Sequence, residues 1–311
     1  MINRELIRLK TVQLIYAYYQ NEGKTLDVAK KELDFSLEKA YDLYLNMLYF
    51  LVEIKQLAEK YAEISKAHDE RMGIFQNRKT PALILSQNLL LNQLSENTTL
   101  CEYVEKHGSV WKDEESLVKK IYQAFLDSET FQLYCTDKEK SYAADRELIR
   151  KLYKDIIMDN PDFDSVLEEQ SLYWNDDKDV VDSFILKTIK RFHPEEEADM
   201  PLLPAYSSDA DYEFAHELFE STILRGEEVR ELIRNNCKNW EFSRLSIMDV
   251  VITQIALTEI LTFPNIPLNV SFNEYLDIAK AYSTPKSSSY INGLLDHIVK
   301  LLQSEGTIMK N

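Results

Sequence analysis

A chain of 311 residues with a formal net charge of −17 is long enough for two domains or one elaborate domain. This acidity argues against a protein that coats nucleic acid generally, because phosphate binding needs Lys and Arg, and it leaves room only for a local basic site. With only 6 Gly and 8 Pro, and with long segments rich in Leu, Lys, Glu, Ala and Gln, the composition is typical of an almost all-helical chain rather than a loop-rich β protein.

The cysteines and the N-terminus indicate where such a protein works. Three widely separated cysteines without C-x-x-C spacing are typical of free thiols in a reducing compartment. The opening "MINRELIRLK" carries charges throughout and lacks the apolar segment of a signal peptide. The longest apolar stretches are too short to cross a membrane, so we expect a soluble cytoplasmic protein.

Hydrophobic periodicity predicts the helices in chain order. A first helix is expected over residues 3–20, and a long helix over 26–65 with a wide apolar stripe that suits packing against several helices. Further helical segments follow between 82 and 135. The stretch "HPEEEADMPLLPAYSSDAD", from His193 to Asp211, has three prolines and no period, so it is the best linker candidate.

The chain also resembles itself. Residues 145–174 align without gaps to residues 211–240, at an offset of 66, with five identities that include Trp174 and Trp240. Each copy reads as two helical segments around a turn, at Asn160-Pro161 and at Arg225-Gly226. The repetition predicts helical hairpins that stack side by side, although amphipathic helices also resemble each other by chance.

The last third of the chain predicts three consecutive helices. The first runs from about Ile247 and stops at Phe263-Pro264, and Ser271-x-x-Glu274 has the form of a capping box for the second. The loop "STPKSSS" leads to the third, which Ser287 or Ser288 opens. Asn-Gly is a turn signal, yet Asn292-Gly293 lies about one turn inside this helix. We therefore expect Gly293 to permit close approach of another helix, namely the N-terminal one, with Asn292 bonding across the contact.

No catalytic or metal-binding pattern stands out. The sequence has no GxGxxG, P-loop, HExxH or Gly-x-Ser-x-Gly motif, and its five histidines are scattered. We expect no enzyme activity, no cofactor and no metal.

The last third of the chain matches the pattern P-x-x-V-x-x-N-E-x-x-x-[IL]-A-K-x-[FY], followed by a short Ser-containing loop and [FY]-[IV]-N-G-[VL]-L-D, and "IALTEI" precedes them. These motifs resemble those of the bacterial transcription antitermination factor NusB family. The first helix resembles the Arg-rich helix that opens the family, but it departs at Glu5 and Leu6, for which Lys10 compensates in part. The residues taken as the structural signature are Asn273, Glu274, Asn292, Gly293 and Asp296.

This resemblance covers residues 3–20 and 211–302, and it implies an all-α fold: a NusB-like helical bundle with additional helical hairpins from an insertion. The implied domains are an Arg-bearing helix (1–24) packed on the C-terminal module, a helical insertion (25–140), a helical segment resembling 211–255 (141–192), a linker (193–210), the NusB-like module (211–305) and a tail (306–311).

The resemblance implies a function without catalysis. NusB-like proteins bind a boxA-type single-stranded RNA together with the small-subunit ribosomal protein that acts as NusE, join the RNA polymerase antitermination complex and support transcription of ribosomal RNA operons. For the protein partner the resemblance points to Tyr16 and Asp249. The acidity of the chain suits a basic ribosomal protein through complementary charge.

The residues themselves are compatible with an RNA site. Arg4 and Arg8 are four residues apart on one helix face, where their guanidinium groups can clamp phosphates. Tyr282 and Tyr290 flank the serine-rich loop with Lys286 between them, and stacking on such aromatics stabilises single strands. The predicted RNA-binding residues are Arg4, Arg8, Lys10, Tyr282, Lys286, Ser287 and Tyr290.

Two other interpretations stay open. The chain could be a NusB-fold protein–protein adaptor without strong RNA binding, which Glu5, Leu6 and the overall acidity favour. It could also be an accessory of ribosomal RNA modification, because NusB-like modules occur fused to RNA methyltransferases.

Overall fold

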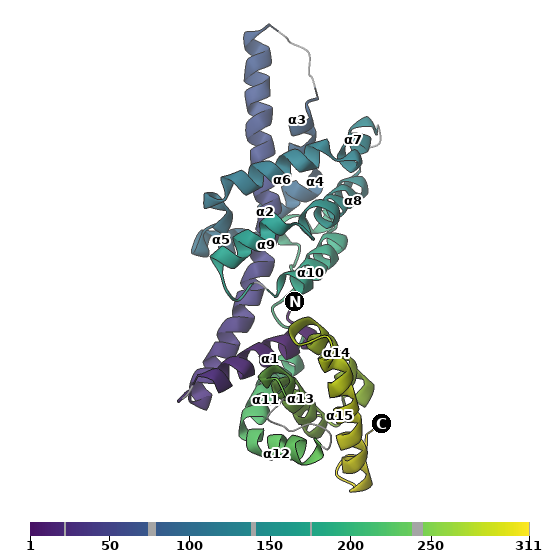
Figure 1. Ribbon diagram of the computed structural model, residues 1–311. Helices are drawn as coiled ribbons and strands as arrows, with labels where there is room; N and C mark the ends of the chain where they lie inside the picture. Colours follow the sequence, from purple (N-terminus) through teal and green to yellow (C-terminus); the bar gives the residue numbers. More distant parts are fainter. Residues whose placement is uncertain (22, 74–78, 138–140, 175, 238–244, 311) are drawn as a thin grey trace. The chain divides into compact units, whose positions relative to one another are not determined.

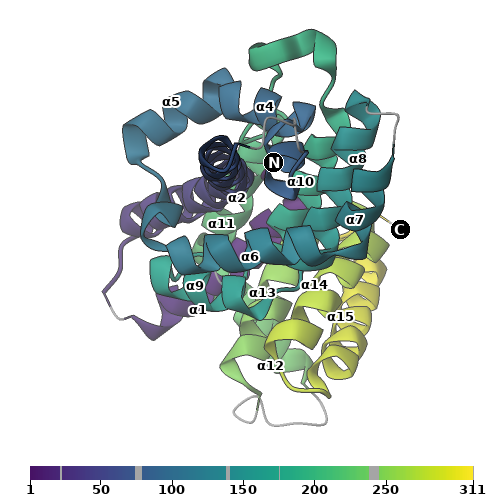
Figure 2. The same cartoon turned by 90° about the horizontal axis from the view of Figure 1, so that it is seen from above.

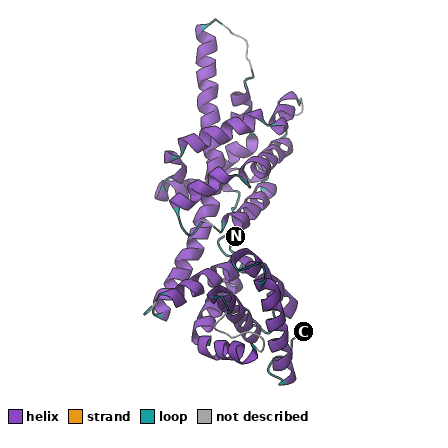
Figure 3. Cartoon of the chain, in the orientation of Figure 1, coloured by secondary structure: helices purple, strands orange, loops and turns teal. Residues whose placement is uncertain are grey.

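The computed structural model describes residues 1–21, 23–73, 79–137, 141–174, 176–237 and 245–310. In this part of the chain every regular element is a helix, and the only pairing of the β type is an isolated bridge between Ile2 and Tyr206 (Figures 1 and 3). The predicted all-α fold class is confirmed. No helix within these ranges is long and apolar enough to cross a membrane.

The helices form two compact units. The terminal unit comprises Ile2–Glu38 and Tyr206–Asn311, and the central unit comprises Met1 and Lys39–Ala205. Helix α2 (Leu26–Arg71) belongs to the terminal unit up to Glu38 and to the central unit from Lys39 onward. This helix continues to Arg71, beyond the expected end at 65, because "KAHDER" consists mostly of good helix formers.

The terminal unit is built around α13 (Ile247–Thr262), in which every residue from 251 to 260 is buried. Five helices contact α13 (Figure 1): α1 (Arg4–Gln20), α11 (Asp209–Leu224), α12 (Gly226–Asn236), α14 (Leu268–Tyr282) and α15 (Ser287–Ser304). Burial on all sides explains how a helix rich in β-branched residues is stable, since packing outweighs intrinsic propensity.

Local signals start and stop these helices. The Asn3 side chain accepts a hydrogen bond from the Leu6 amide at 2.9 Å and caps α1. Ser246 caps α13 in the same way, through the Asp249 amide at 3.0 Å. The final helix begins at Ser287, but the predicted serine cap was wrong: Lys286 is the N-cap residue, no side chain caps this helix, and the Ser287 hydroxyl accepts from the Thr284 amide in the preceding loop instead.

The capping box predicted at Ser271 and Glu274 was wrong. Helix α14 begins at Leu268, directly after Pro267, so Ser271 is its fourth residue and faces the core. Its hydroxyl donates to the Glu259 carboxylate at 2.6 Å rather than accepting from a backbone amide of its own first turn. Proline fixes the entry of this helix, because its φ suits the residue before the first turn.

Gly226, at the start of α12, is the tightly packed glycine of the terminal unit. A Cβ at this position would lie 2.8 Å from the Tyr19 hydroxyl oxygen and 3.3 Å from Gln254 Nε2. Neither neighbour moves freely, because Gln254 donates to the Tyr19 hydroxyl at 2.8 Å and the Arg230 guanidinium lies 4.3 Å from the centroid of the Tyr19 ring. The turn predicted at Arg225-Gly226 thus brings α1, α12 and α13 into contact.

Replacing Gly226 with Ala is expected to lower the free energy of unfolding by about 1–3 kcal/mol, because the added methyl group overpacks this contact. The matched control is Gly293→Ala in α15, where a Cβ would meet no atom within 4 Å. That change should raise the stability by up to about 1 kcal/mol, since Ala is the better helix former. Urea unfolding of the two variants side by side measures both effects, and equal stability of Gly226→Ala and the unaltered chain would contradict the expected clash.

The central unit consists mostly of short helices packed around the second part of α2. Most begin at a side-chain cap from Ser, Thr or Asn, for example Thr80, Asn88 and Ser128. In chain order they are α3 (Pro81–Ser86), α4 (Leu89–Glu96), α5 (Thr98–His107), η1 (Val110–Asp113), α6 (Glu115–Asp127), α7 (Glu129–Thr136), α8 (Tyr142–Leu152), η2 (Tyr153–Ile157), α9 (Pro161–Gln170), α10 (Lys178–Arg191) and η3 (Pro194–Asp199).

The stretch 193–210, predicted as a linker, is ordered in its first half. The Gln93 side chain donates to the carbonyl oxygens of His193 and Glu197 at 2.8 and 2.9 Å, and Asn97 donates to that of Met200 at 2.7 Å. These bonds hold η3 to α4 and α5 within the central unit.

Each unit contains one copy of the helical repeat that was predicted from the sequence. In the central unit α10 packs on α8, with α9 between them in the chain, and in the terminal unit α13 packs on α11, with α12 between them (Figure 2). The aligned pairs that are buried in both copies include Leu148/Phe214, Leu152/Leu218, Tyr153/Phe219, Phe163/Val229, Leu167/Ile233, Ile185/Val251 and Ile189/Ile255. Trp240, the partner of Trp174 in the alignment, lies outside the described residues.

Candidate functional site

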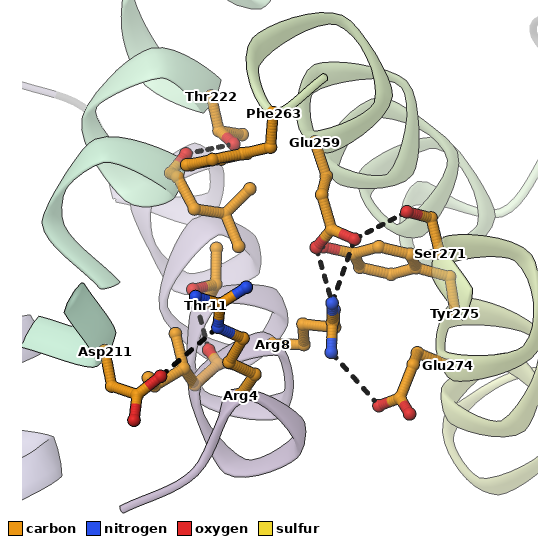
Figure 4. Close-up of polar contacts among 12 residues, drawn as sticks. Arg4, Arg8, Thr11, Asp211, Thr222, Glu259, Phe263, Ser271, Glu274 and Tyr275 are labelled. Atoms are coloured by element: carbon orange, nitrogen blue, oxygen red, sulfur yellow. Dashed lines mark hydrogen bonds and ion pairs between the residues drawn. The ribbon is translucent and has the colours of Figure 1, made fainter. Parts of the chain in front are cut away.

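A buried ion pair connects the first helix to the C-terminal helices of the terminal unit. The Arg8 guanidinium donates from Nε and Nη2 to the two carboxylate oxygens of Glu259, at 2.8 and 3.0 Å (Figure 4). Arg8 is 3% exposed and Glu259 is fully buried. This two-bond geometry is the strongest that an arginine and a carboxylate can form.

The carboxylate of Glu259 has further donors from α14. The Ser271 hydroxyl donates to one oxygen at 2.6 Å and the Tyr275 hydroxyl to the other at 2.9 Å, while Arg8 Nη1 also lies 3.3 Å from Glu274 (Figure 4). Burial alone would lower the pKa of Arg8, but the hydrogen bond and charge of Glu259 outweigh it and raise that pKa. Burial, and then the charge of Glu259, raise the pKa of Tyr275 well above its usual value. The cluster therefore holds one charge pair between α1, α13 and α14.

Arg4 has a different environment from Arg8, although both share one face of α1. Both guanidinium groups lie over the Phe214 ring, at 4.8 and 5.4 Å from its centroid. Arg4 is 43% exposed and pairs with Asp211 at 3.2 Å, so it remains accessible to a ligand. Arg8 and Lys10 are buried, and a direct contact of either with RNA stays a prediction that would require this packing to open.

The loop between α14 and α15 is held by a small polar frame. The Ser283 hydroxyl donates to Asp249 Oδ1 at 2.5 Å, and the Ser287 hydroxyl accepts from the Thr284 amide at 3.2 Å. Asp249 and Ser287 are both buried, with 8% and 3% of their surfaces exposed. Pro285 and Lys286 are exposed at the tip, so the frame fixes the loop and presents a cation.

Tyr282 and Tyr290 flank this loop and are both half-buried. The Tyr290 hydroxyl donates to Cys237 Sγ at 3.5 Å, which fixes the direction of its ring. Burial, and then the hydrogen bond and charge of Cys237, raise the pKa of Tyr290. Tyr282, Lys286 and Tyr290 thus belong to one short stretch of the chain. Ser287 holds this stretch in place through its hydrogen bond with the Thr284 amide.

The other predicted residues are dispersed over the terminal unit. Tyr16 is half-buried on α1, and Asp249 is engaged with Ser283 as described above. Of the signature residues, Glu274 contacts Arg8, Asp296 pairs with Lys300 at 2.7 Å, and Asn273 and Asn292 are exposed.

The expectation that Gly293 lies at a tight helix contact was wrong. No heavy atom would approach a Cβ at this position within 4 Å, and the neighbouring Asn292 is exposed. The N-terminal helix is joined to the C-terminal module through Arg8 and Glu259 instead. Glu259 is the single acid of the motif "IALTEI", for which no role was predicted. A lone acid inside an apolar run signals a buried partner.

These contacts define an all-helical module in which the first helix is joined to a C-terminal helical bundle by a buried ion pair. The model of the NusB family matches residues 186–300. Transcription antitermination protein NusB of Geotalea uraniireducens (strain Rf4) is 33% identical over 133 residues, which are 43% of this chain and 89% of that protein. The chain belongs to the NusB family, and it is longer than this relative.

Two further relatives carry the same name, transcription antitermination protein NusB. The one from Salinibacter ruber is 39% identical over 98 residues, 32% of this chain and 61% of that protein, and the one from Chloroherpeton thalassium is 35% identical over 99 residues, 32% and 47%. The chain thus spans less than two thirds of the length of these two relatives. A solved structure of T. maritima NusB is 24% identical and covers 44% of this chain and 82% of that chain, with a TM-score of 0.29.

Proposed function

We propose that this protein is a transcription antitermination factor that binds a boxA-type single-stranded RNA together with the small-subunit ribosomal protein acting as NusE. The observation that carries the proposal is the loop at Lys286, a cation between two half-buried tyrosines on a frame of partly buried hydrogen bonds. The name shared by the relatives supports the same function. The protein acts without catalysis, in the cytoplasm, as part of an RNA polymerase complex on ribosomal RNA operons.

In this proposal the exposed residues contact the RNA directly. Bases stack on Tyr282 and Tyr290, and Lys286 and Arg4 neutralise phosphates. The buried residues Arg8, Lys10 and Ser287 act by holding α1 and the loop in place. The partner contacts Tyr16 and the region of Asp249, and the excess of acidic residues on the chain attracts a basic ribosomal protein.

Reversing the charge of Lys286 is expected to weaken binding of a boxA-type RNA about tenfold and to reduce the salt dependence by about one phosphate contact. Fluorescence anisotropy with a short labelled boxA-type RNA, with and without the ribosomal partner, measures both quantities. Lys300→Glu is the matched control, because Lys300 is exposed on α15, the helix that follows the loop, and the change in net charge is identical. Equal losses for the two variants would assign the effect to net charge rather than to the loop.

Tyr290 provides a second test of the same site. Tyr290→Leu should weaken binding about tenfold through the loss of stacking, whereas Tyr290→Phe retains the ring and should bind as the unaltered chain does. If Tyr290→Leu binds the RNA as tightly as the unaltered chain does, Tyr290 does not belong to the RNA site.

The second candidate is a protein–protein adaptor of the NusB fold without strong RNA binding. The burial of Arg8 and Lys10 and the pairing of Arg4 with Asp211 favour it, since these leave few free cations on α1. An unaltered chain that binds the ribosomal partner but no boxA-type RNA, even with that partner present, would select the adaptor.

A further inference from the structure

The central unit has a cavity of about 460 Å³ between α2, η1 and the start of α6. Both chain segments that line it, 49–60 and 109–118, are described without a gap. The buried residues of this lining are apolar, namely Leu57, Trp111 and Val118, and its charged residues are of both signs, namely Glu53, Lys60, Lys112 and Glu115. We propose that this α2–α6 cavity binds a short peptide of about three residues, which it recognises through the ammonium group at one end and the carboxylate at the other.

One end of the cavity suits an ammonium group. Tyr49 and Glu53 are four residues apart on α2, so they lie on the same side of this helix, and both are half-buried. The Ser109 hydroxyl donates to Glu53 Oε1 at 2.7 Å, which orients the carboxylate and leaves its charge in place. An ammonium group at this end therefore gains the charge of Glu53 and lies next to the Tyr49 ring, an arrangement that stabilises cations.

The other end of the cavity suits a carboxylate. Lys60 follows Glu53 on α2 at a distance of about 10 Å along the helix axis, and Lys112 of η1 lines the same cavity. Both lysines are exposed, and neither forms an ion pair with a described residue. The remaining acid of the lining, Glu115, pairs with Lys119 at 2.9 Å, so its charge is already offset. A carboxylate at this end therefore meets an excess of positive charge.

The distance between the two ends selects the length of the peptide. An extended chain spans about 3.3–3.6 Å per residue, so the ends of a tripeptide lie about 10 Å apart, which matches the spacing of Glu53 and Lys60. A dipeptide is about 3 Å too short to reach both charges. Leu57 lies between these two residues on α2, so the apolar part of the lining contacts the middle residue and favours an apolar side chain there. The volume of the cavity lies in the range of small-molecule sites.

Calorimetric titration of the full chain with the tripeptide Ala-Leu-Ala tests the cavity. Glu53→Gln and Lys60→Met should each weaken binding about tenfold, because each removes one charge-assisted hydrogen bond to an end of the peptide. The matched controls are Glu63→Gln and Lys66→Met, exposed positions of α2 that do not line the cavity and that change the net charge identically. They should bind the tripeptide as the unaltered chain does, and thermal unfolding of all four variants should change little.

Blocking one end of the peptide at a time assigns each charge to its partner. The N-acetylated tripeptide should bind Glu53→Gln and the unaltered chain equally, because both changes remove the same contact, and it should still lose affinity in Lys60→Met. The C-amidated tripeptide should show the reverse. No binding of Ala-Leu-Ala by the unaltered chain, or equal affinities of the free and the doubly blocked tripeptide, overturns the proposal. Equal losses in the cavity variants and in their controls overturn it as well, and none of these outcomes concerns RNA binding by the terminal unit.

Discussion

Replacing Glu259 with Ala is expected to destabilise the terminal unit by about 3–5 kcal/mol, because the buried Arg8 guanidinium loses two charge-assisted hydrogen bonds and keeps only the partly exposed Glu274 as a counter-charge. The loss exceeds that of an ordinary core truncation, since the hydroxyl groups of Ser271 and Tyr275 also lose their acceptor. The change affects a buried contact shared by α1, α13 and α14, so we expect α1 to detach first.

Hydrogen exchange measures this effect better than a single unfolding curve, because two compact units need not unfold together. Amides of α1, α13 and α14 should exchange faster in Glu259→Ala, while those of α8 and α10 in the central unit serve as an internal reference. Asp277→Ala is the matched control, since this acid lies on α14 with 71% of its side chain exposed and pairs only across the surface with Lys280. It should change the stability by less than about 0.5 kcal/mol.

The double variant Arg8→Met/Glu259→Leu tests the reason for the loss. Removing both charges leaves no buried ion without a partner, so the double change should cost less than the sum of the two single changes. If Glu259→Ala unfolds at the same urea concentration as the unaltered chain, the ion pair does not hold α1.

The helices themselves were predictable because their signals are local. Periodicity predicted the first helix as 3–20 against an observed Arg4–Gln20, and the last helix begins at Ser287, one of the two serines expected to open it, although neither caps it. The start of a helix was ambiguous where two local sequence signals indicated different first residues. The Ser271-x-x-Glu274 pattern resembles a capping box, but Pro267 starts the helix one turn earlier and turns Ser271 toward Glu259.

The site was less predictable because its contacts span most of the chain. Arg8 and Glu259 are 251 residues apart, and no local pattern shows whether an arginine on an amphipathic helix faces solvent or a carboxylate. The two glycines within helices could not be distinguished from the sequence for the same reason. Gly226 is closely packed and Gly293 is open, and only their neighbours in space distinguish them.

The internal repeat preserves helices but not the long-range contact of Arg8. In the terminal unit Arg8 on α1 binds the side chain of Glu259, and in the central unit Gln93 on α4 binds the carbonyl oxygen of His193. His193 is the position that aligns with Glu259 at the offset of 66 residues. At this aligned position the terminal unit uses a side-chain carboxylate within a helix and the central unit uses a backbone carbonyl after a helix, so the two contacts differ in kind.

Replacing Asp249 with Ala is expected to cost about 2–3 kcal/mol, and it should weaken RNA binding as well. The buried carboxylate accepts from the Ser283 hydroxyl, and a hydrogen bond to a charged group contributes about 1.5–3 kcal/mol. Asp249 also lies in the first turn of α13, where a negative charge stabilises the helix by about 0.3–1 kcal/mol. Without it the loop at Lys286 loses its attachment to the core.

The conservative change Asp249→Asn separates this structural role from the predicted contact with the ribosomal partner. Asn retains an acceptor for Ser283 but removes the charge, so the loop and the RNA affinity should be preserved almost fully. If Asp249 also contacts a basic partner, the affinity for that partner should fall about tenfold in Asp249→Asn while urea unfolding changes little. If partner affinity falls only in Asp249→Ala, together with stability, then Asp249 acts through the loop that it holds, and the acidic attraction must come from exposed carboxylates elsewhere on the chain.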